Sequence, residues 1–282
     1  MSVSTSLLRR SALTAGVVVA LVTLAGCSGG AGSATTDGGA KLLTPGTLTI
    51  CANSSSPPNI FTEPDGTVVG TEVDIAKAIA DQVGVKTEFK EYAFSGLIPA
   101  LQARQCDVIM SSLYIKPERE EVADFVPYLR SGSGVATSKS NPKNITGLDD
   151  SMCGTKVIAI TGATGAALVE EQSATCAADG KPAIDLTLTD RSADALQQVI
   201  AGQLDAFVDS AEIVNYYEKQ SDGQFVPVGD QIGVIDIGAA TLKDNAALHD
   251  ELQAAFDKIV ADGTYAGILD TWGLQAQDIT QS

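Results

Sequence analysis

The feature that most limits the possible folds of this chain is a regular alternation of short apolar strands with amphipathic helices from residue 47 onward. Within residues 72–83, apolar side chains recur at helical spacing, and residues 107–110 form an apolar run typical of a strand buried on both faces. Strands that alternate with helices at this spacing predict βαβ units and parallel sheets, and therefore an α/β fold. The expected strands are 48–50, 85–89, 107–110, 156–160, 184–188 and 206–208. The expected helices are 72–83, 96–103, 117–122, 164–172, 193–201 and a long pair within 245–273, broken at 262–264.

Two segments of the chain are similar to each other. Residues 103–112 can be laid on residues 201–210 at a constant offset of 98, with identical Ala, Gln, Asp and final Ser. This similarity indicates two related lobes, in which Ser111-Ser112 and Asp209-Ser210 end corresponding strands. Because ligands of open α/β sheets bind outside the carboxyl ends of the strands, we expect these side chains to face a shared cleft.

The N-terminus has the pattern of an export signal. Arg9 and Arg10 precede an uncharged apolar run at 11–25, which is short for a membrane span. The run ends in Leu24-Ala25-Gly26-Cys27, which resembles the bacterial lipobox, where a signal peptidase cuts before a cysteine that receives a lipid. We therefore expect a lipoprotein signal peptide at 1–26, lipidation of Cys27 and a flexible linker at 27–45. An ordinary signal peptide with Cys27 incidental remains an alternative, and the sequence leaves Sec or Tat export open.

Charge and composition exclude several classes of function. The chain has 18 Lys plus Arg and 35 Asp plus Glu, for a formal net charge of −17. A surface this acidic repels phosphate backbones, so nucleic acid is not an expected partner. The single histidine, His249, argues against Ser-His-Asp catalysis and multi-histidine metal sites, and there is no CxxC pair. We expect no metal and no cofactor.

Four cysteines remain once Cys27 is assigned to lipid, and an even number in an exported protein indicates disulfides. Cys153 and Cys176 bracket one short unit and are expected to pair with each other. A bridge between Cys51 and Cys106 follows by parity. If their strands are parallel neighbours, however, the two cysteines sit at different levels of the sheet, so the sequence leaves this second bridge open.

Four stretches of the chain resemble the bacterial extracellular solute-binding proteins that deliver polar amino acids to ABC importers. These stretches are Gly70-Thr-Glu-Val-Asp-Ile-Ala-Lys-Ala-Ile-Ala80, Gly96-Leu-Ile-Pro-Ala-Leu-Gln102, Asp107-Val-Ile-Met-Ser-Ser-Leu-Tyr-Ile-Lys-Pro-Glu-Arg119 and Asp262-Gly-Thr-Tyr-Ala-Gly-Ile-Leu-Asp-Thr-Trp-Gly273. The resemblance implies the type II periplasmic-binding-protein fold, which has two α/β lobes, a hinge and a central ligand cleft. It places lobe 1 at 46–131 and 238–282, and lobe 2 at 132–237. Hinge closure around the ligand is the expected motion.

The resemblance also implies roles for individual residues. Arg119 matches the arginine that holds the ligand α-carboxylate, and a guanidinium offers the planar fork of donors that a carboxylate accepts. Ser111 and Ser112 match positions that contact the same head group, and Phe94 matches the residue that covers the ligand side chain. The loop with Gly162 and Thr164 matches one that donates hydroxyl and N–H groups at a helix start.

Other positions of the implied site depart from the family pattern. Asn53 stands where an aspartate is common, and Ser56 and Asn59 stand where aromatic residues are common. Tyr114 replaces a serine or threonine. Ser210 occupies the position of the aspartate that binds the ligand ammonium, and Asp209 lies one residue early, which in a strand turns the side chain to the other face. An amino acid is the expected ligand, with an opine, a modified amino acid or another small carboxylate as alternatives.

The resemblance implies a binding protein and not an enzyme. Its partners would be a small-molecule ligand, the membrane subunits of an ABC permease and, through the lipid anchor, the outer face of the cell membrane. We expect an extracytoplasmic monomer. Two alternatives remain open, an exported dehydratase-like enzyme on the same fold and a ligand-sensing module; the enzyme would need a cleft acid or base, for which Asp209 is the candidate.

Overall fold

The computed structural model describes residues 35, 36 and 38–281. The expected signal peptide and the lipidation site at Cys27 lie outside these residues. Within them, no helix is long and apolar enough to cross a membrane.

One eight-stranded sheet organises the described residues. Its strands are β1 (Thr47–Ala52), β5 (Lys86–Glu91), β6 (Val108–Ile109), β7 (Ala123–Ser138), β8 (Lys156–Ile160), β9 (Asp185–Thr189), β10 (Ala206–Ser210) and β11 (Phe225–Leu242). They lie in the order β5-β1-β6-β11-β7-β10-β8-β9. Pairs β1–β5, β1–β6, β8–β9 and β8–β10 are parallel, whereas β6–β11, β11–β7 and β7–β10 are antiparallel. A separate three-stranded sheet, which the sequence did not predict, contains β2 (Ser55–Ser56), β3 (Ile60–Thr62) and β4 (Val68–Val69).

The strand order has the same pattern in both halves of the sheet. β1, with β5 and β6 on its two sides, corresponds to β8, with β9 and β10 on its two sides. The two aspartates of the sequence repeat occupy equivalent places: Asp107 donates its N–H to Thr49 O (2.8 Å) and accepts the Thr49 N–H (2.8 Å), and Asp205 does the same with Lys156 (2.7 and 2.8 Å). Each aspartate thus fixes the start of the strand that leads to the cleft. The two segments of the repeat therefore occupy equivalent places, but β6 ends at Ile109, two residues before Ser111, whereas β10 continues to Ser210.

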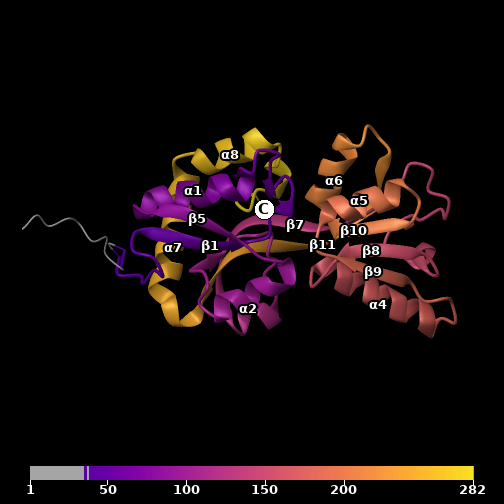
Figure 1. Ribbon diagram of the computed structural model, residues 1–282, viewed down its shortest axis with the longest axis horizontal. Helices are drawn as coiled ribbons and strands as arrows, with labels where there is room; N and C mark the ends of the chain where they lie inside the picture. The colour runs from indigo at the N-terminus through magenta and orange to yellow at the C-terminus, as the bar shows by residue number, and fades with distance from the viewer. Residues whose placement is uncertain (1–34, 37, 282) are drawn as a thin grey trace, which may run out of the picture. The chain divides into compact units, whose positions relative to one another are not determined.

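Helices cover both faces of each half of the sheet (Figure 1). They are α1 (Thr71–Val83), α2 (Leu97–Gln102), α3 (Pro117–Glu120), α4 (Thr164–Ala178), α5 (Ser192–Ile200), α6 (Ala211–Gln220), α7 (Ala246–Ala261) and α8 (Thr264–Trp272), with single 3-10 turns η1 (Phe94–Gly96), η2 (Asp150–Met152), η3 (Lys243–Asn245) and η4 (Gln275–Gln277). In lobe 1, α1, α7 and α8 enclose one core with β1 and β6, and α2 encloses the other. In lobe 2, α5 and α6 cover one face and α4 the other.

The two long strands β7 and β11 connect the lobes, since they pair with each other along both halves of the sheet. Lobe 1 pairs with β11 through β6, and lobe 2 pairs with β7 through β10. The register between β7 and β11 shifts at Val228/Ile232, Ile232/Ile235 and Ile237/Gly238, so the ladder is irregular where the chain crosses between lobes. These features confirm the predicted two-lobed α/β fold.

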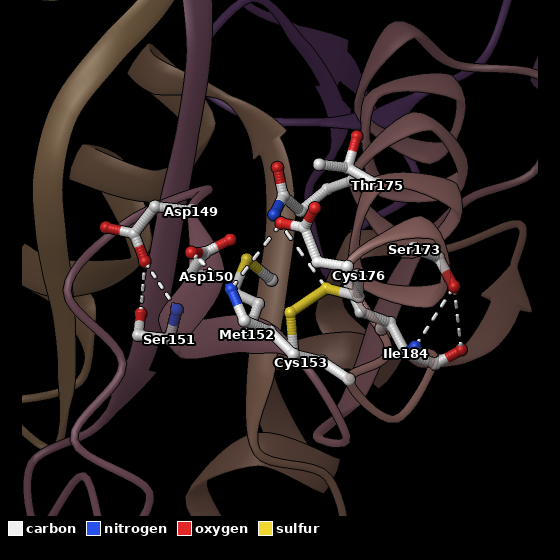
Figure 2. Close-up of a disulfide and its surroundings, with 12 residues drawn as sticks. Asp149, Asp150, Ser151, Met152, Cys153, Ser173, Thr175, Cys176 and Ile184 are labelled. Atoms are coloured by element: carbon white, nitrogen blue, oxygen red, sulfur yellow. Dashed lines mark hydrogen bonds and ion pairs between the residues drawn. A yellow bond between two sulfur atoms is a disulfide. The ribbon is translucent and has the colours of Figure 1, made fainter.

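Two disulfides are present in the structure. Cys153 follows η2 and is bonded to Cys176 in the last turn of α4, with Cα atoms 5.6 Å apart (Figure 2). This bond ties the C-terminal end of α4 to the segment that leads into β8. Cys51 in β1 is bonded to Cys106, also at 5.6 Å. Cys106 lies in the turn before β6 and not in the strand itself. It is therefore not held at a different position along the sheet from Cys51, as the sequence alone suggested, and the second bridge can form.

Candidate functional site

A polar cavity lies between the lobes, at the carboxyl ends of β6, β8 and β10 and at the N-terminus of α4. Lobe 1, the connecting strand β7 and lobe 2 all contribute to its wall. The lining residues are Ser56, Phe94, Ser112, Tyr114, Arg119, Ser133, Ile160, Ala163, Thr164, Gly165, Asp209, Ser210 and Ile213. The space open to the centre of a water molecule is only about 20 Å³, which is room for about one or two waters. Entry of a larger ligand therefore requires the lobes to separate.

The structure brings most of the predicted site residues together at this cavity. Three of them lie outside it: two have polar side chains that bond to the protein itself, and the third is a glycine. Asn53 donates its side-chain N–H to Tyr92 O (2.9 Å) and accepts from the Ser55 hydroxyl. Ser111 is fully buried and accepts the Asn53 backbone N–H (2.8 Å). Gly162 has φ +75° and packs against lobe 1, where an added Cβ would lie 3.2 Å from the Ser95 Cβ.

Five lining residues were not anticipated from the sequence: Ser133, Ile160, Ala163, Gly165 and Ile213. Ile160 ends β8, so the rule for strand ends could have identified it. Gly165 lies in the first turn of α4, where a Cβ would be 2.7 Å from Val208 O of β10. The absence of a side chain there lets the helix N-terminus approach the strand ends.

Arg119 brings a positive charge to the lobe 1 side of the cavity. One guanidinium nitrogen donates to Tyr114 O (2.8 Å), and the Arg119 Cζ lies 5.7 Å from the centre of the Phe94 ring, which is cation–π range. Among the described residues, Arg119 forms no ion pair. Burial lowers the pKa of this guanidinium, because a charge without a counter-ion is costly away from water. The remaining donors are suited to a carboxylate.

The N-terminus of α4 reaches the cavity from lobe 2. The helix has 15 residues and begins at Thr164, and the amide groups of its first turn have no partner within the helix. The Thr164 hydroxyl is buried and has no hydrogen-bond partner among the described residues. An unpaired hydroxyl at the positive end of a helix dipole suits an anionic group that is also held by Arg119.

Asp209 supplies the negative charge of the cavity. One of its carboxylate oxygens accepts the Ser210 N–H (2.8 Å) and the other accepts the Ser192 hydroxyl (3.1 Å). Burial raises its pKa to about 7, while these two hydrogen bonds act in the opposite direction. Strand β10 has no bulge at this point, and the chain enters α6 directly after Ser210, so Asp209 and Ser210 both reach the cavity.

Tyr114 spans the cleft between the lobes. Its hydroxyl lies 3.0 Å from Gly132 O on β7 and 3.1 Å from the Ser210 Oγ in lobe 2. Burial raises the pKa of this phenol far above its ordinary value, so it remains a neutral donor. The larger side chain at this position fills space that a serine or threonine would leave open.

A buried polar network supports the cavity wall. Ser112 has φ +48°, and its N–H donates to Glu72 (2.6 Å), while Asn59 donates one amide to both the Ser112 hydroxyl and Glu212 (2.9 Å each). Glu212 also accepts from the Ser131 hydroxyl. The Asn59–Glu212 hydrogen bond joins lobe 1 to α6 of lobe 2. Burial raises the pKa of Glu72 to about 7 and raises that of Glu212.

The described residues contain no group of three or more His, Cys, Asp or Glu side chains placed to hold a metal ion. The cavity instead combines one guanidinium, one carboxylate, a helix N-terminus and several hydroxyls at the junction of two lobes. This arrangement defines a two-lobed binding protein whose ligand is enclosed between the lobes. The sequence profile of the bacterial extracellular solute-binding proteins, family 3, matches residues 48–275, and the chain belongs to this family.

Individual relatives agree with this assignment. The chain is 28% identical to the arginine-binding protein ArgT of Corynebacterium glutamicum over 288 residues, covering 95% of this chain and 92% of the relative. An ancestral arginine-binding protein, solved with bound arginine, is 32% identical and superposes with a TM-score of 0.73 over 80% of this chain and 98% of its own. The ancestral amino acid-binding protein AncCDT-1, a precursor of cyclohexadienyl dehydratase, is 30% identical, with a TM-score of 0.70 over 80% of this chain and 95% of its own.

Proposed function

We propose that this protein captures an α-amino acid between its lobes and delivers it to an ABC permease. The observation that carries the proposal is that one cavity contains a buried guanidinium from lobe 1 and a buried carboxylate from lobe 2. The head group of an amino acid has one group of each sign. Arg119, the α4 N-terminus and the Thr164 hydroxyl receive its carboxylate, and Asp209 receives its ammonium, with Ser210 and the Tyr114 hydroxyl as neighbouring polar groups.

Ligand binding drives closure because each lobe contributes one half of the charge pair. Without a ligand, Arg119 and Asp209 each carry the cost of burial without a counter-ion. A bound zwitterion supplies both counter-ions at once, and it does so only when the lobes are together. A ligand shifts a conformational equilibrium by its difference in affinity for the two states, so this dependence favours the closed form.

Calorimetry with a panel of amino acids tests the proposal. We expect Arg119→Ala to weaken binding of the best ligand at least a hundredfold, because the charge-assisted hydrogen bonds to its carboxylate are lost. Arg104→Ala is the matched control, since Arg104 is exposed and paired with Asp244 away from the cleft. If Arg119→Ala binds with unchanged affinity, or if no amino acid binds the parent protein, the proposal is wrong.

An enzymatic function is the second candidate, supported by the likeness to a dehydratase precursor and by the raised pKa of Asp209. An acid with a pKa near 7 can transfer protons at neutral pH. We propose binding without chemistry, because the described cavity offers a single titratable carboxylate and no partner base. Recovery of the ligand after long incubation distinguishes the two functions: unchanged ligand supports capture, and a new product supports the enzyme.

We also propose that Cys27 carries a lipid that holds the protein, as a monomer, on the outer face of the cell membrane. The lobes would then span 46–131 with 238–282, and 132–237. The support is the lipobox-like sequence before Cys27 and the family membership. Cys27→Ser should release the protein into the medium, whereas the Cys106→Ser variant, which keeps Cys27, should stay with the membrane fraction. Retention of Cys27→Ser on the membrane would exclude this anchor.

A further inference from the structure

The charges around the cavity restrict the ligand beyond its head group. Among the described residues that line the cavity, Arg119 and Asp209 alone carry a charge. An α-carboxylate and an α-ammonium occupy both. No lining carboxylate then remains for a guanidinium or ammonium on the ligand side chain, and no lining cation remains for a second carboxylate. A charged side chain enclosed here would be buried without a counter-ion, which is costly.

Two buried acids of the network that supports the cavity wall are already engaged with the protein. The two Glu212 oxygens accept from Asn59 and Ser131, and a Glu72 oxygen accepts from the Ser112 N–H and from the Tyr128 hydroxyl (2.5 Å). Neither glutamate is among the lining residues.

The same holds for the predicted side-chain contact at Asn53. Its amide is used by Tyr92 O and the Ser55 hydroxyl, and it lies outside the cavity. Its oxygen already accepts from the Ser55 hydroxyl, and a neutral amide supplies no counter-charge to a ligand guanidinium.

The remaining wall of the cavity is uncharged. Phe94 from lobe 1 faces Ile160, Ala163 and Ile213 from lobe 2, and Ile213 is 2% exposed. The apolar wall and the two charges therefore restrict the ligand in the same direction.

We propose that the ligand is an α-amino acid with an uncharged side chain, such as alanine, serine, threonine or valine. This inference rests on the proposed function. It differs from the arginine named for the similar proteins, and it assigns Phe94, Ile160 and Ile213 as the residues that determine specificity.

Calorimetry with the exported protein, purified from the membrane fraction, tests the inference. We expect the best of alanine, serine, threonine and valine to bind at least tenfold more tightly than arginine, lysine and glutamate. Citrulline, which has nearly the shape of arginine without its charge, isolates the effect of charge and should bind more tightly than arginine. Equal or tighter binding of a charged amino acid overturns the inference, and so does binding of arginine as tight as that of citrulline. Binding of no amino acid would instead reject the proposed function.

A pair of variants tests the specificity residues directly. Ile213→Asp places a carboxylate in the apolar wall, and Ile213→Asn is the matched polar variant without charge. We expect the aspartate variant to bind arginine or lysine at least tenfold more tightly than the asparagine variant does. Equal affinity of the two folded variants for both cations would show that Ile213 does not face the ligand side chain. If either variant fails to fold, the ligand panel with the parent protein still decides the inference.

Discussion

Glu72 gives the sharpest test of the buried network, because its ionisation is coupled to folding. The side chain is 0% exposed, and one of its oxygens accepts from the Ser112 N–H and the Tyr128 hydroxyl, while the other has no partner among the described residues. Burial, with a contribution from the Glu212 charge, raises its pKa from 4.5 to about 7. We expect Glu72→Gln to stabilise the protein increasingly as the pH rises from 4.5 to 8.

The magnitude follows from proton linkage. Below pH 4.5, Glu72 is protonated in both the folded and the unfolded states, so its ionisation costs nothing. Between pH 4.5 and about 7 the folded state retains a proton that the unfolded state has lost, and stability falls by about 1.4 kcal/mol per pH unit. The full loss is about 3 kcal/mol. A glutamine side chain at this position would keep the acceptor oxygen without the titration, so the difference in free energy of unfolding between variant and parent should grow by about 3 kcal/mol across this range.

Urea denaturation at a series of pH values from 4.5 to 8 measures this difference. Any constant effect of exchanging an oxygen for an amide cancels, because only the change with pH is compared. The removal of a like charge near Glu212 acts in the same direction. Glu171→Gln, which exchanges the same groups at an exposed position, is the control. A Glu72→Gln difference that stays constant to within about 1 kcal/mol would refute the assignment of a buried, proton-linked carboxyl.

Three further predictions concern the cleft and its supports. Because burial raises the pKa of Asp209 to about 7, affinity for an ammonium-bearing ligand should fall by up to tenfold per pH unit below 7, and calorimetry with Asp209→Asn should show weaker binding without this dependence. Replacing both Cys153 and Cys176, which are 23 residues apart, by serine should lower the free energy of unfolding by about 3 kcal/mol; a loss below about 1 kcal/mol in urea titrations would contradict the structural role. Gly165→Ala should destabilise the protein by about 1–3 kcal/mol, since its Cβ would meet Val208 O at 2.7 Å. The control Gly267→Ala in α8, where nothing lies within 4 Å, should stabilise it by up to about 1 kcal/mol. Equal melting temperatures of the two variants would argue against the close approach at Gly165.

The fold was predictable because its signals are local and repeated. The apolar spacing of α1 and the bounds of β8 follow from periodicity alone. The offset repeat was informative for a physical reason that appears only in the structure, since Asp107 and Asp205 make the same pair of hydrogen bonds to the neighbouring strands β1 and β8. By contrast, β2 to β4 are two or three residues long, too short for any periodic pattern to emerge.

The lining residues of the cavity were predictable where a strand end also matched a position of the family resemblance. They were less predictable where the direction of a side chain determines whether it reaches the cavity. Asn53 and Ser56 are close in the sequence, yet only Ser56 lines the cavity, because Asn53 is held by Tyr92 O. Ser133 gave no signal, since it lies within β7, a long strand whose middle reaches the cleft only through the pairing of the two lobes. Tertiary contacts of this kind are not encoded in any short segment of the sequence.

The order of Asp209 and Ser210 shows why alternation along a strand is insufficient at its end. In a continuing strand the two side chains would lie on opposite faces, and only one could reach the ligand. Here Ser210 is both the last residue of β10 and the N-cap of α6, so the chain turns at the position where the faces would diverge. The Asp209 carboxylate is oriented by Ser192 on one side, and the Ser210 hydroxyl lies 3.1 Å from the Tyr114 hydroxyl on the other. The carboxylate therefore lies one residue earlier than the family resemblance implies, but it still lines the cavity. The cleft thus keeps both charges that a zwitterionic ligand requires.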